Sequence, residues 1–304
     1  MKRCLAFFVS IILLACTYPC YGSEAKTKTA KINLGIAASL HPKMSLFDFQ
    51  NLGFFKVPLG LSKEAFEEAV ARTAAGTSSQ VLHKRLEELE VELSEITRKK
   101  QVLFQSSANA EPGNDTARPQ LAALDDQARQ LRIERSEAEF AIEHPELTPP
   151  SETRSILKDI DSEVMEAVRG VATENGYDVV LNSTFPVPFG YPLTYRTGKE
   201  FGRGVSGLEQ QVFYALTANH DDLDQQETKE DRFSIWLQLT GHPETQRFLP
   251  IQPWPLVVHG GESITPDVVR NIYMRHKISP EIIDIVVSVI EEFESSPPPI
   301  PGEK

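Results

Sequence analysis

Residues 174–187 read ENGYDVVLNSTFPV, and this stretch decides the fold. A helix predicted over residues 156–173 must end before Gly176, because glycine readily adopts the left-handed conformation that closes helices. Residues 177–181, Tyr-Asp-Val-Val-Leu, have the aromatic and β-branched composition of a short strand. The stretch therefore predicts a helix that leads directly into a strand. The residues expected to hold this part of the fold together are Gly176, Tyr177, Val180 and Leu181.

A second short strand is predicted near the N-terminus. Residues 31–36, KINLGI, alternate between polar and apolar side chains, which would place Ile32, Leu34 and Ile36 on one face of a strand. The loop that follows, residues 40–61, holds four phenylalanines. They could form an exposed binding patch, but we expect them to be buried against the base of the following helices.

A long heptad pattern occupies the middle of the chain. Apolar residues step by alternating four and three positions over residues 82–103, and the same spacing returns over residues 121–142. Between them, residues 106–119 contain two prolines and a glycine, which indicate a turn. We predict an antiparallel coiled-coil hairpin over residues 62–143, although such seams can also pair between chains. The first seam consists of Leu82, Leu86, Leu89, Leu93, Ile96, Lys100 and Leu103.

Two helix breaks are predicted at the base of this hairpin. Gly76 lies in the small and polar run AAGTSS, which weakens the outgoing helix. On the return, residues 144–150 read HPELTPP, and proline interrupts a helix because it cannot donate a backbone hydrogen bond. We therefore expect a helix break both where the chain enters the arm and where it leaves the arm.

The order of strand, helical hairpin, helix and strand, with the Gly-Tyr-Asp-Val-Val-Leu run of residues 176–181, resembles the Skp/OmpH family of periplasmic chaperones. The resemblance covers a domain over residues 30–187. It implies a small β-sheet body that assembles as a homotrimer, with three coiled-coil hairpins as the prongs of a clamp. It also implies a holdase that binds unfolded outer-membrane proteins without ATP. The break over residues 144–150 departs from the family, whose members have one continuous helix there.

The N-terminus has the composition of an export signal, assigned to residues 1–22. Lys2 and Arg3 precede an apolar run that is too short to span a bilayer. Two interpretations of its processing remain open: cleavage by ordinary signal peptidase, or lipidation at Cys16, which follows Leu-Leu-Ala. The protein is accordingly expected in the periplasm of a Gram-negative bacterium, or as an envelope lipoprotein anchored at Cys16. All three cysteines lie in this segment, so no disulfide is expected in the exported part.

The remainder of the chain is interpreted as an added module. Residues 188–207 are rich in proline and glycine and predict a linker. Residues 208–294 are assigned to a C-terminal helical module, which ends in a tight pair of helices that begin at Thr265-Pro266 and Ser279-Pro280. The last residues, 295–304, contain four prolines and are predicted to be disordered.

Signals for catalysis or cofactor binding are weak. The net charge of −12 argues against nucleic acid, whose phosphates require lysine and arginine. Residues 202–207 match the Gly-x-Gly-x-x-Gly pattern, but no apolar strand precedes them, so no nucleotide site is expected. The seven histidines are scattered without metal-ligand spacing, and no nucleophile motif is present. We therefore expect no enzyme activity, no catalytic residue, no cofactor and no metal.

The predicted fold class is α+β and mostly helical, with a small sheet, a projecting hairpin and a C-terminal helical module. The predicted function is that of an ATP-independent periplasmic chaperone for unfolded outer-membrane proteins. The alternative is a non-catalytic structural or adaptor protein of the bacterial cell envelope, in soluble or lipid-anchored form. Oligomeric state distinguishes the two hypotheses, because the clamp requires a trimer and the adaptor does not.

Overall fold

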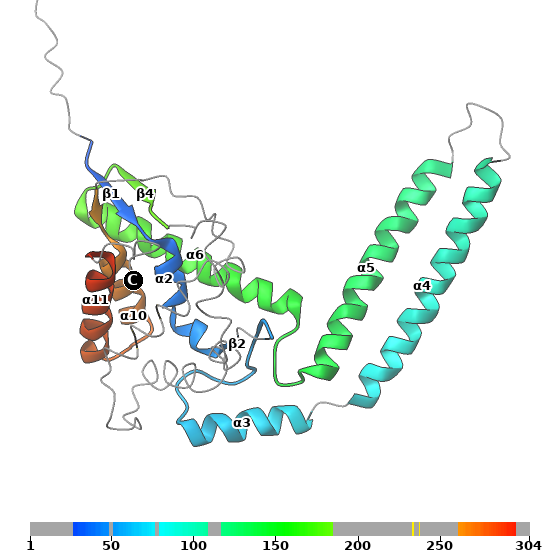
Figure 1. Cartoon of the computed structure of the whole chain (residues 1–304), viewed down its shortest axis with the longest axis horizontal. Coiled ribbons are helices and arrows are strands. Elements are labelled where there is room, and N and C mark those ends of the chain that lie inside the picture. The colour runs from blue at the N-terminus through cyan, green and yellow to red at the C-terminus, as the bar shows by residue number, and fades with distance from the viewer. Residues whose placement is uncertain are drawn as a thin grey trace, which may run out of the picture.

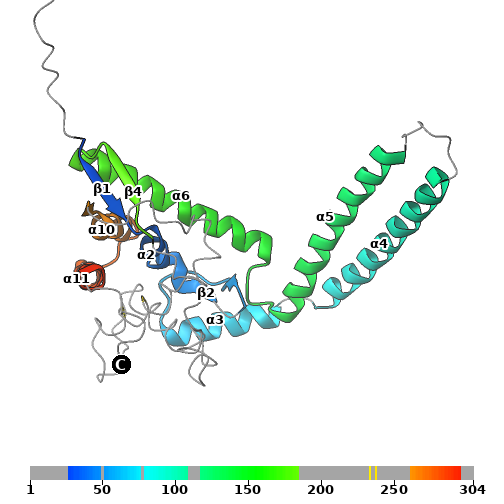
Figure 2. The ribbon, with the colours of Figure 1, turned by 45° about the horizontal axis from the view of Figure 1, so that its top comes forward.

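The computed structural model describes residues 27–48, 51–76, 79–108, 117–184 and 261–295, together with Phe233 and Leu237. The protein is α+β and mostly helical, which confirms the predicted fold class. Figures 1 and 2 show a body of helices around a small sheet, and an arm of two long helices that projects from it.

Thirteen elements follow one another in the described residues. In chain order they are β1 (Thr29–Ile32), α2 (Leu34–Ser39), the 3₁₀ helix η1 (Pro42–Leu46), β2 (Phe47–Asp48), β3 (Gly53–Phe54), α3 (Lys63–Gly76), α4 (Ser79–Ala108), α5 (Ala117–Glu143), α6 (Pro150–Asn175), β4 (Val179–Asn182), β5 (Glu262–Ser263), α10 (Thr265–Arg275) and α11 (Pro280–Ser295). Among them, no helix combines the length and the apolar composition that a membrane span needs.

The main sheet has three parallel strands in the order β4-β1-β5. Thr29 pairs with Val179 and Ile32 with Asn182, so the two strands predicted from the sequence are neighbours. The short strand β5 lies on the other side of β1. The strand β4 begins just after Gly176, which ends α6 with a φ of 66°. The structure thus confirms both the helix end and the following strand.

The first strand is shorter than predicted. It ends at Ile32, and Leu34 and Ile36 lie in the helix α2 instead of continuing the strand. The side chain of Asn33 accepts a hydrogen bond from the backbone N–H of Ile36 at 3.0 Å and so caps this helix. An asparagine cap stabilises a helix start. The chain after Asn33 is therefore helical, although the short alternating pattern predicted a strand. The assignment of Leu34 and Ile36 to the strand was therefore wrong.

One continuous hydrophobic core holds the body together. The helices α2, α6 and α10 pack against one another, and α11 packs against α10. The face of α6 that enters this core consists of Leu157, Ile160, Val164, Ala167, Val168 and Val171. The buried side chains of α10 and α11 belong to the same cluster as those of β1 and α2. The helical pair at the C-terminus is thus part of the body, and the prediction that it belongs to a separate module was wrong.

Several sequence predictions fall outside the described residues. These are the signal segment over residues 1–22, the linker over residues 188–207, most of the module before residue 261, and the last nine residues. Phe233 and Leu237 are the described exceptions; both are helical and both are buried.

Of the four phenylalanines predicted to be buried, Phe47 and Phe54 are buried and Phe55 is half-buried against the core. Phe47 in β2 and Phe54 in β3 pair across a two-stranded sheet, with ring centroids 4.9 Å apart and less than 4% of each side chain exposed. Phe55 stacks edge-on against Phe66 of α3 at 5.3 Å. These contacts fix α3 to the body. Phe49 lies outside the described residues.

Both predicted breaks occur at the base of the arm. The helix α3 ends at Gly76 and α4 begins at Ser79, while α5 ends at Glu143 and α6 begins at Pro150. Because α3 packs on the body, the hairpin itself consists of α4 and α5 and does not begin at residue 62. At 1.5 Å per residue, the 30 residues of α4 span about 45 Å.

Candidate functional site

The arm is held together by an apolar seam near its middle. Four side chains of the seam are buried between α4 and α5, and Leu93 and Leu124 pack against them. The buried members are Leu89, Ile96, Ala128 and Leu131. Of the other predicted seam residues, Leu82 and Leu86 are half-buried. The heptad pattern therefore pairs within one chain, as an antiparallel hairpin.

Ion pairs fix the register of the two arm helices. Arg85 of α4 contacts Glu134 of α5 at 2.7 Å, and Arg135 of α5 contacts Glu90 of α4 at 3.4 Å. The hydrogen bond that Arg85 donates to Glu134 is the main reason that the pKa of Arg85 is raised. Exposed pairs of this kind add little stability, but they select one alignment among those that the heptads allow.

In the distal third of the arm, a charged residue interrupts the apolar seam. Its next position is Lys100, which forms an ion pair with Asp125 and thereby lowers the pKa of that carboxyl. Beyond Lys100, the side chains of Val102 and Phe104 are 59% and 69% exposed. The two residues are two positions apart on α4, so they point to different sides of the helix.

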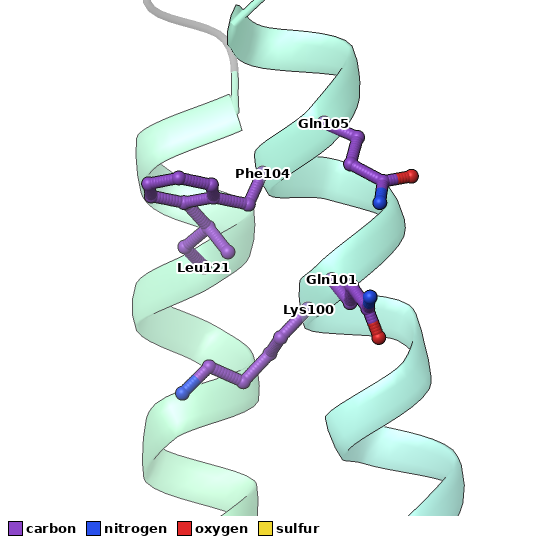
Figure 3. A pocket seen from close by; sticks show the side chains of 5 residues that line it. All are labelled: Lys100, Gln101, Phe104, Gln105 and Leu121. Atoms are coloured by element: carbon purple, nitrogen blue, oxygen red, sulfur yellow. The ribbon is translucent and has the colours of Figure 1, made fainter.

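Two open hollows flank the distal seam. One has a volume of about 440 Å³ and lies beside Lys100, Phe104 and Leu121. Figure 3 shows the ring of Phe104 over Leu121 of α5, with Lys100 extending across the same side. The other hollow, of about 640 Å³, lies beside Arg98, Val102 and Leu124. Since the two hollows share no lining residue, both flanks of the distal arm offer apolar surface beside basic side chains.

The predicted strand residues have a structural role in the body. Ile32 and Ile36 are buried, and Leu34, Val180 and Leu181 are half-buried. The hydroxyl of Tyr177 donates a hydrogen bond to Glu262, and Lys28 lies 4.2 Å above its ring. In Figure 2 the strands β1 and β4 lie on the side of the body that faces away from α4 and α5, so these residues position the sheet and not the candidate site.

A second group of polar side chains lies inside the body, and no motif predicted it. His41 caps η1, Glu163 lies in the middle of α6, and His276 directly follows α10. Glu163 Oε1 lies 2.8 Å from His276 Nε2, and Glu163 Oε2 lies 3.1 Å from His41 Nε2. The two imidazole rings meet edge to face at 5.1 Å. The fold thus gathers three residues that are more than 100 positions apart in sequence.

The protonation of this cluster follows from burial. His41 is fully buried, and the loss of solvation lowers the pKa of its imidazole below 6.5. His41, and after it His276, lowers the pKa of the Glu163 carboxyl to about 2. The 3.1 Å contact is a close approach and not a well-directed hydrogen bond, since His41 Nε2 has no hydrogen-bond partner among the described residues. At neutral pH the cluster consists of an ionised carboxylate beside a neutral buried imidazole.

No protein-family model, curated protein or solved structure matches this chain. Its function is therefore inferred from the geometry of the arm and the body.

Proposed function

We propose that this protein is an exported, ATP-independent holdase that binds unfolded outer-membrane proteins along the distal part of its arm. The observation that carries the proposal is the exposure of Val102 and Phe104 beside the two open hollows. An unfolded barrel protein exposes strand edges and apolar side chains that aggregate in water. Apolar flanks on a projecting arm would cover such segments.

The arrangement suits weak and repeated binding. The middle of the arm is held by the buried seam around Leu89 and Ile96, so the distal surface is carried on a rigid support. Its two flanks offer shallow apolar contacts with Arg98, Lys99 and Lys100 close by. Many such contacts would retain a client without a deep pocket and without nucleotide. The proposed clamp is a homotrimer, in which three arms enclose the client.

The test uses dilution of a urea-unfolded outer-membrane β-barrel protein into buffer, followed by light scattering. The wild-type chain should suppress aggregation at a near-stoichiometric ratio without nucleotide. The double variant Val102→Ser and Phe104→Ser should lose most of this suppression, because it removes the distal apolar surface. The matched control is Val81→Ser and Val91→Ser, since these valines of α4 are 66% and 60% exposed but lie outside both hollows.

Two results would contradict the proposal. One is a folded wild-type protein that fails to slow barrel aggregation at several-fold excess. The other is equal protection by a chain in which residues 79–143 are replaced by a short Gly/Ser linker. Equal loss in the distal variant and in the control variant would mean that the binding surface is not confined to the distal arm.

The alternative function, an adaptor of the cell envelope, is favoured by a different observation. Within one chain, β1 is paired on both sides and its sheet is covered by α2, α6 and α10. The body therefore forms its hydrophobic core within one chain and does not require two further copies of the chain for this. A single arm cannot enclose a client. A monomer at micromolar concentration, measured by light scattering coupled to size exclusion, would exclude the clamp. Binding of one defined envelope partner by that monomer would establish the adaptor.

A further inference from the structure

The cluster of His41, Glu163 and His276 has the composition and the spacing of a transition-metal site. Its ligand atoms all lie within 4.8 Å of one another. With bonds of about 2.0–2.2 Å, two ligands of a tetrahedral zinc ion lie about 3.3–3.5 Å apart. The contacts of 2.8 and 3.1 Å to the two carboxylate oxygens need to open by a few tenths of an ångström. We propose that these three side chains bind one Zn²⁺ ion, through the two Nε2 atoms and the carboxylate.

A second observation points to a ligand at the same place. The Nε2 atom of His41 is buried and has no hydrogen-bond partner in the described part of the chain. Buried polar atoms are nearly always satisfied, and an exception calls for an explanation such as a bound ion. This nitrogen faces the Glu163 carboxylate, so a cation between them would satisfy both groups.

The composition of the cluster suits a metal. A metal ligand has to be a deprotonated carboxylate or a neutral imidazole, and the cluster brings together one glutamate and two histidines. One rearrangement is required. The backbone N–H of Lys43 donates to Nδ1 of His41 at 3.2 Å, which leaves the ring proton on Nε2. When zinc binds, this proton must move to Nδ1, and the capping hydrogen bond to Lys43 opens.

The ligand set selects zinc over the common hard cations. Two imidazole nitrogens and one carboxylate suit Zn²⁺, whereas Mg²⁺ and Ca²⁺ prefer oxygen ligands. Glu163 and His276 are 23% and 20% exposed, so an ion can enter and water can occupy a fourth position. The ammonium group of Lys43 lies 4.0 Å from Glu163 and is the cation that zinc would displace; its side chain is 36% exposed and can turn outward.

The site would join three parts of the body. His41 lies between α2 and η1, Glu163 lies in α6, and His276 ends α10. A bound ion would therefore tie the C-terminal helical pair to the N-terminal part of the core. It would act independently of the arm and of the holdase proposal.

The test uses the full chain, purified without a polyhistidine tag, treated with chelator and titrated with zinc chloride by isothermal titration calorimetry. We expect one zinc ion per chain, a higher melting temperature with zinc, and no competition from excess Mg²⁺. His276→Gln should weaken binding by at least about tenfold, since even changes to groups behind the ligands cost ten- to a hundredfold. Glu163→Gln should behave in the same way. The matched control, His83→Gln, changes an exposed histidine of α4 and should bind as the wild type does.

Cobalt replacement provides a readout that misfolding cannot imitate. Co²⁺ bound at this site should give the visible absorption bands of a four-coordinate ion with nitrogen ligands, and His276→Gln should lose them. Absence of zinc binding by the wild-type chain would overturn the proposal. So would an equal loss of affinity in His83→Gln and His276→Gln, which would indicate adventitious binding at surface histidines.

Discussion

The hydroxyl of Thr265 accepts a hydrogen bond from the backbone N–H of Asn33 at 3.0 Å, although the two residues are 232 positions apart. Thr265 is fully buried at the start of α10, and its hydroxyl also donates to Glu294 of α11. Asn33 is the residue that caps α2 directly after β1. One threonine thus connects the first strand of the body to both C-terminal helices.

Replacing Thr265 with valine should lower the free energy of unfolding by about 1–3 kcal/mol, because the half-buried N–H of Asn33 then loses its acceptor on the buried Thr265 side chain. Valine has nearly the same shape, so the loss reflects the hydroxyl and not a cavity. Urea denaturation measures the change. The control is Thr97→Val, whose exposed hydroxyl donates to Leu93 within the arm and whose loss should change stability by less than about 0.5 kcal/mol. Equal effects in the two variants would show that the Asn33 contact is not formed.

Removal of residues 261–304 should prevent the body from folding. These residues supply β5 and twelve buried apolar side chains, each worth about 1.5–3 kcal/mol, against a total stability of about 5–15 kcal/mol. The twelve are Ile264, Val268, Val269, Ile272, Tyr273, Ile278, Ile282, Ile283, Val286, Val287, Val289 and Ile290.

Circular dichroism and limited proteolysis measure the result of this truncation. The matched truncation removes residues 296–304 alone and should retain the melting transition of the full chain. If the chain that ends at residue 260 melts cooperatively like the full chain, the C-terminal helices form a separate module, as their sequence alone suggested.

The sequence predicts those elements whose signals are local. Gly176 marks the end of α6, the run after it forms β4, and the prolines between residues 144 and 150 separate arm from body. The end of β1 was not predictable in the same way. The alternating pattern of residues 31–36 is too short to exclude a helix, and the cap formed by Asn33 decides the conformation.

Long-range features could not be predicted from a single sequence. Glu262 and Ser263 are not residues that favour strands, and their place beside β1 depends on α10 packing against α2 and α6. The cluster of His41, Glu163 and His276 could not be predicted either, because it forms by tertiary packing and no spacing in the sequence connects its members. The distal basic residues Arg98 and Lys99 were also missed, since they lie more than two turns before the end of α4 and not in the turn itself.

The contact between Tyr177 and Glu262 should make stability depend on alkaline pH. The hydrogen bond to Glu262 raises the pKa of Tyr177 from 10.0 to about 12. The folded protein therefore holds this proton more tightly than the unfolded chain does. The stabilisation is complete below pH 10 and is lost as the pH rises toward 12. Urea midpoints of the wild type and of Tyr177→Phe, compared across this range, measure it.

The variant Tyr177→Phe should be less stable than the wild type at pH 8, and the difference should shrink between pH 10 and pH 12. In the variant, absorbance titration of the phenolate should lack one late-titrating tyrosine. A constant difference in stability across the range would mean that the Tyr177 hydroxyl is not bound to Glu262 in solution.

Truncation of Leu89 should open the arm and leave the body folded. Leu89 is fully buried between α4 and α5, and a leucine-to-alanine change at such a position costs about 2–5 kcal/mol. The seam of the arm forms a cluster separate from the core of the body, and α4 and α5 are joined to the body through breaks after Gly76 and after Glu143. The loss should therefore remain local.

Hydrogen exchange followed by mass spectrometry should show faster exchange across α4 and α5 and unchanged protection in α6 and α10. The control is Val91→Ala, which is 60% exposed on the same helix and should leave both regions unchanged. Faster exchange in α6 as well would show that arm and body unfold as one unit, and the arm would then be unable to open around a client while the body stays intact.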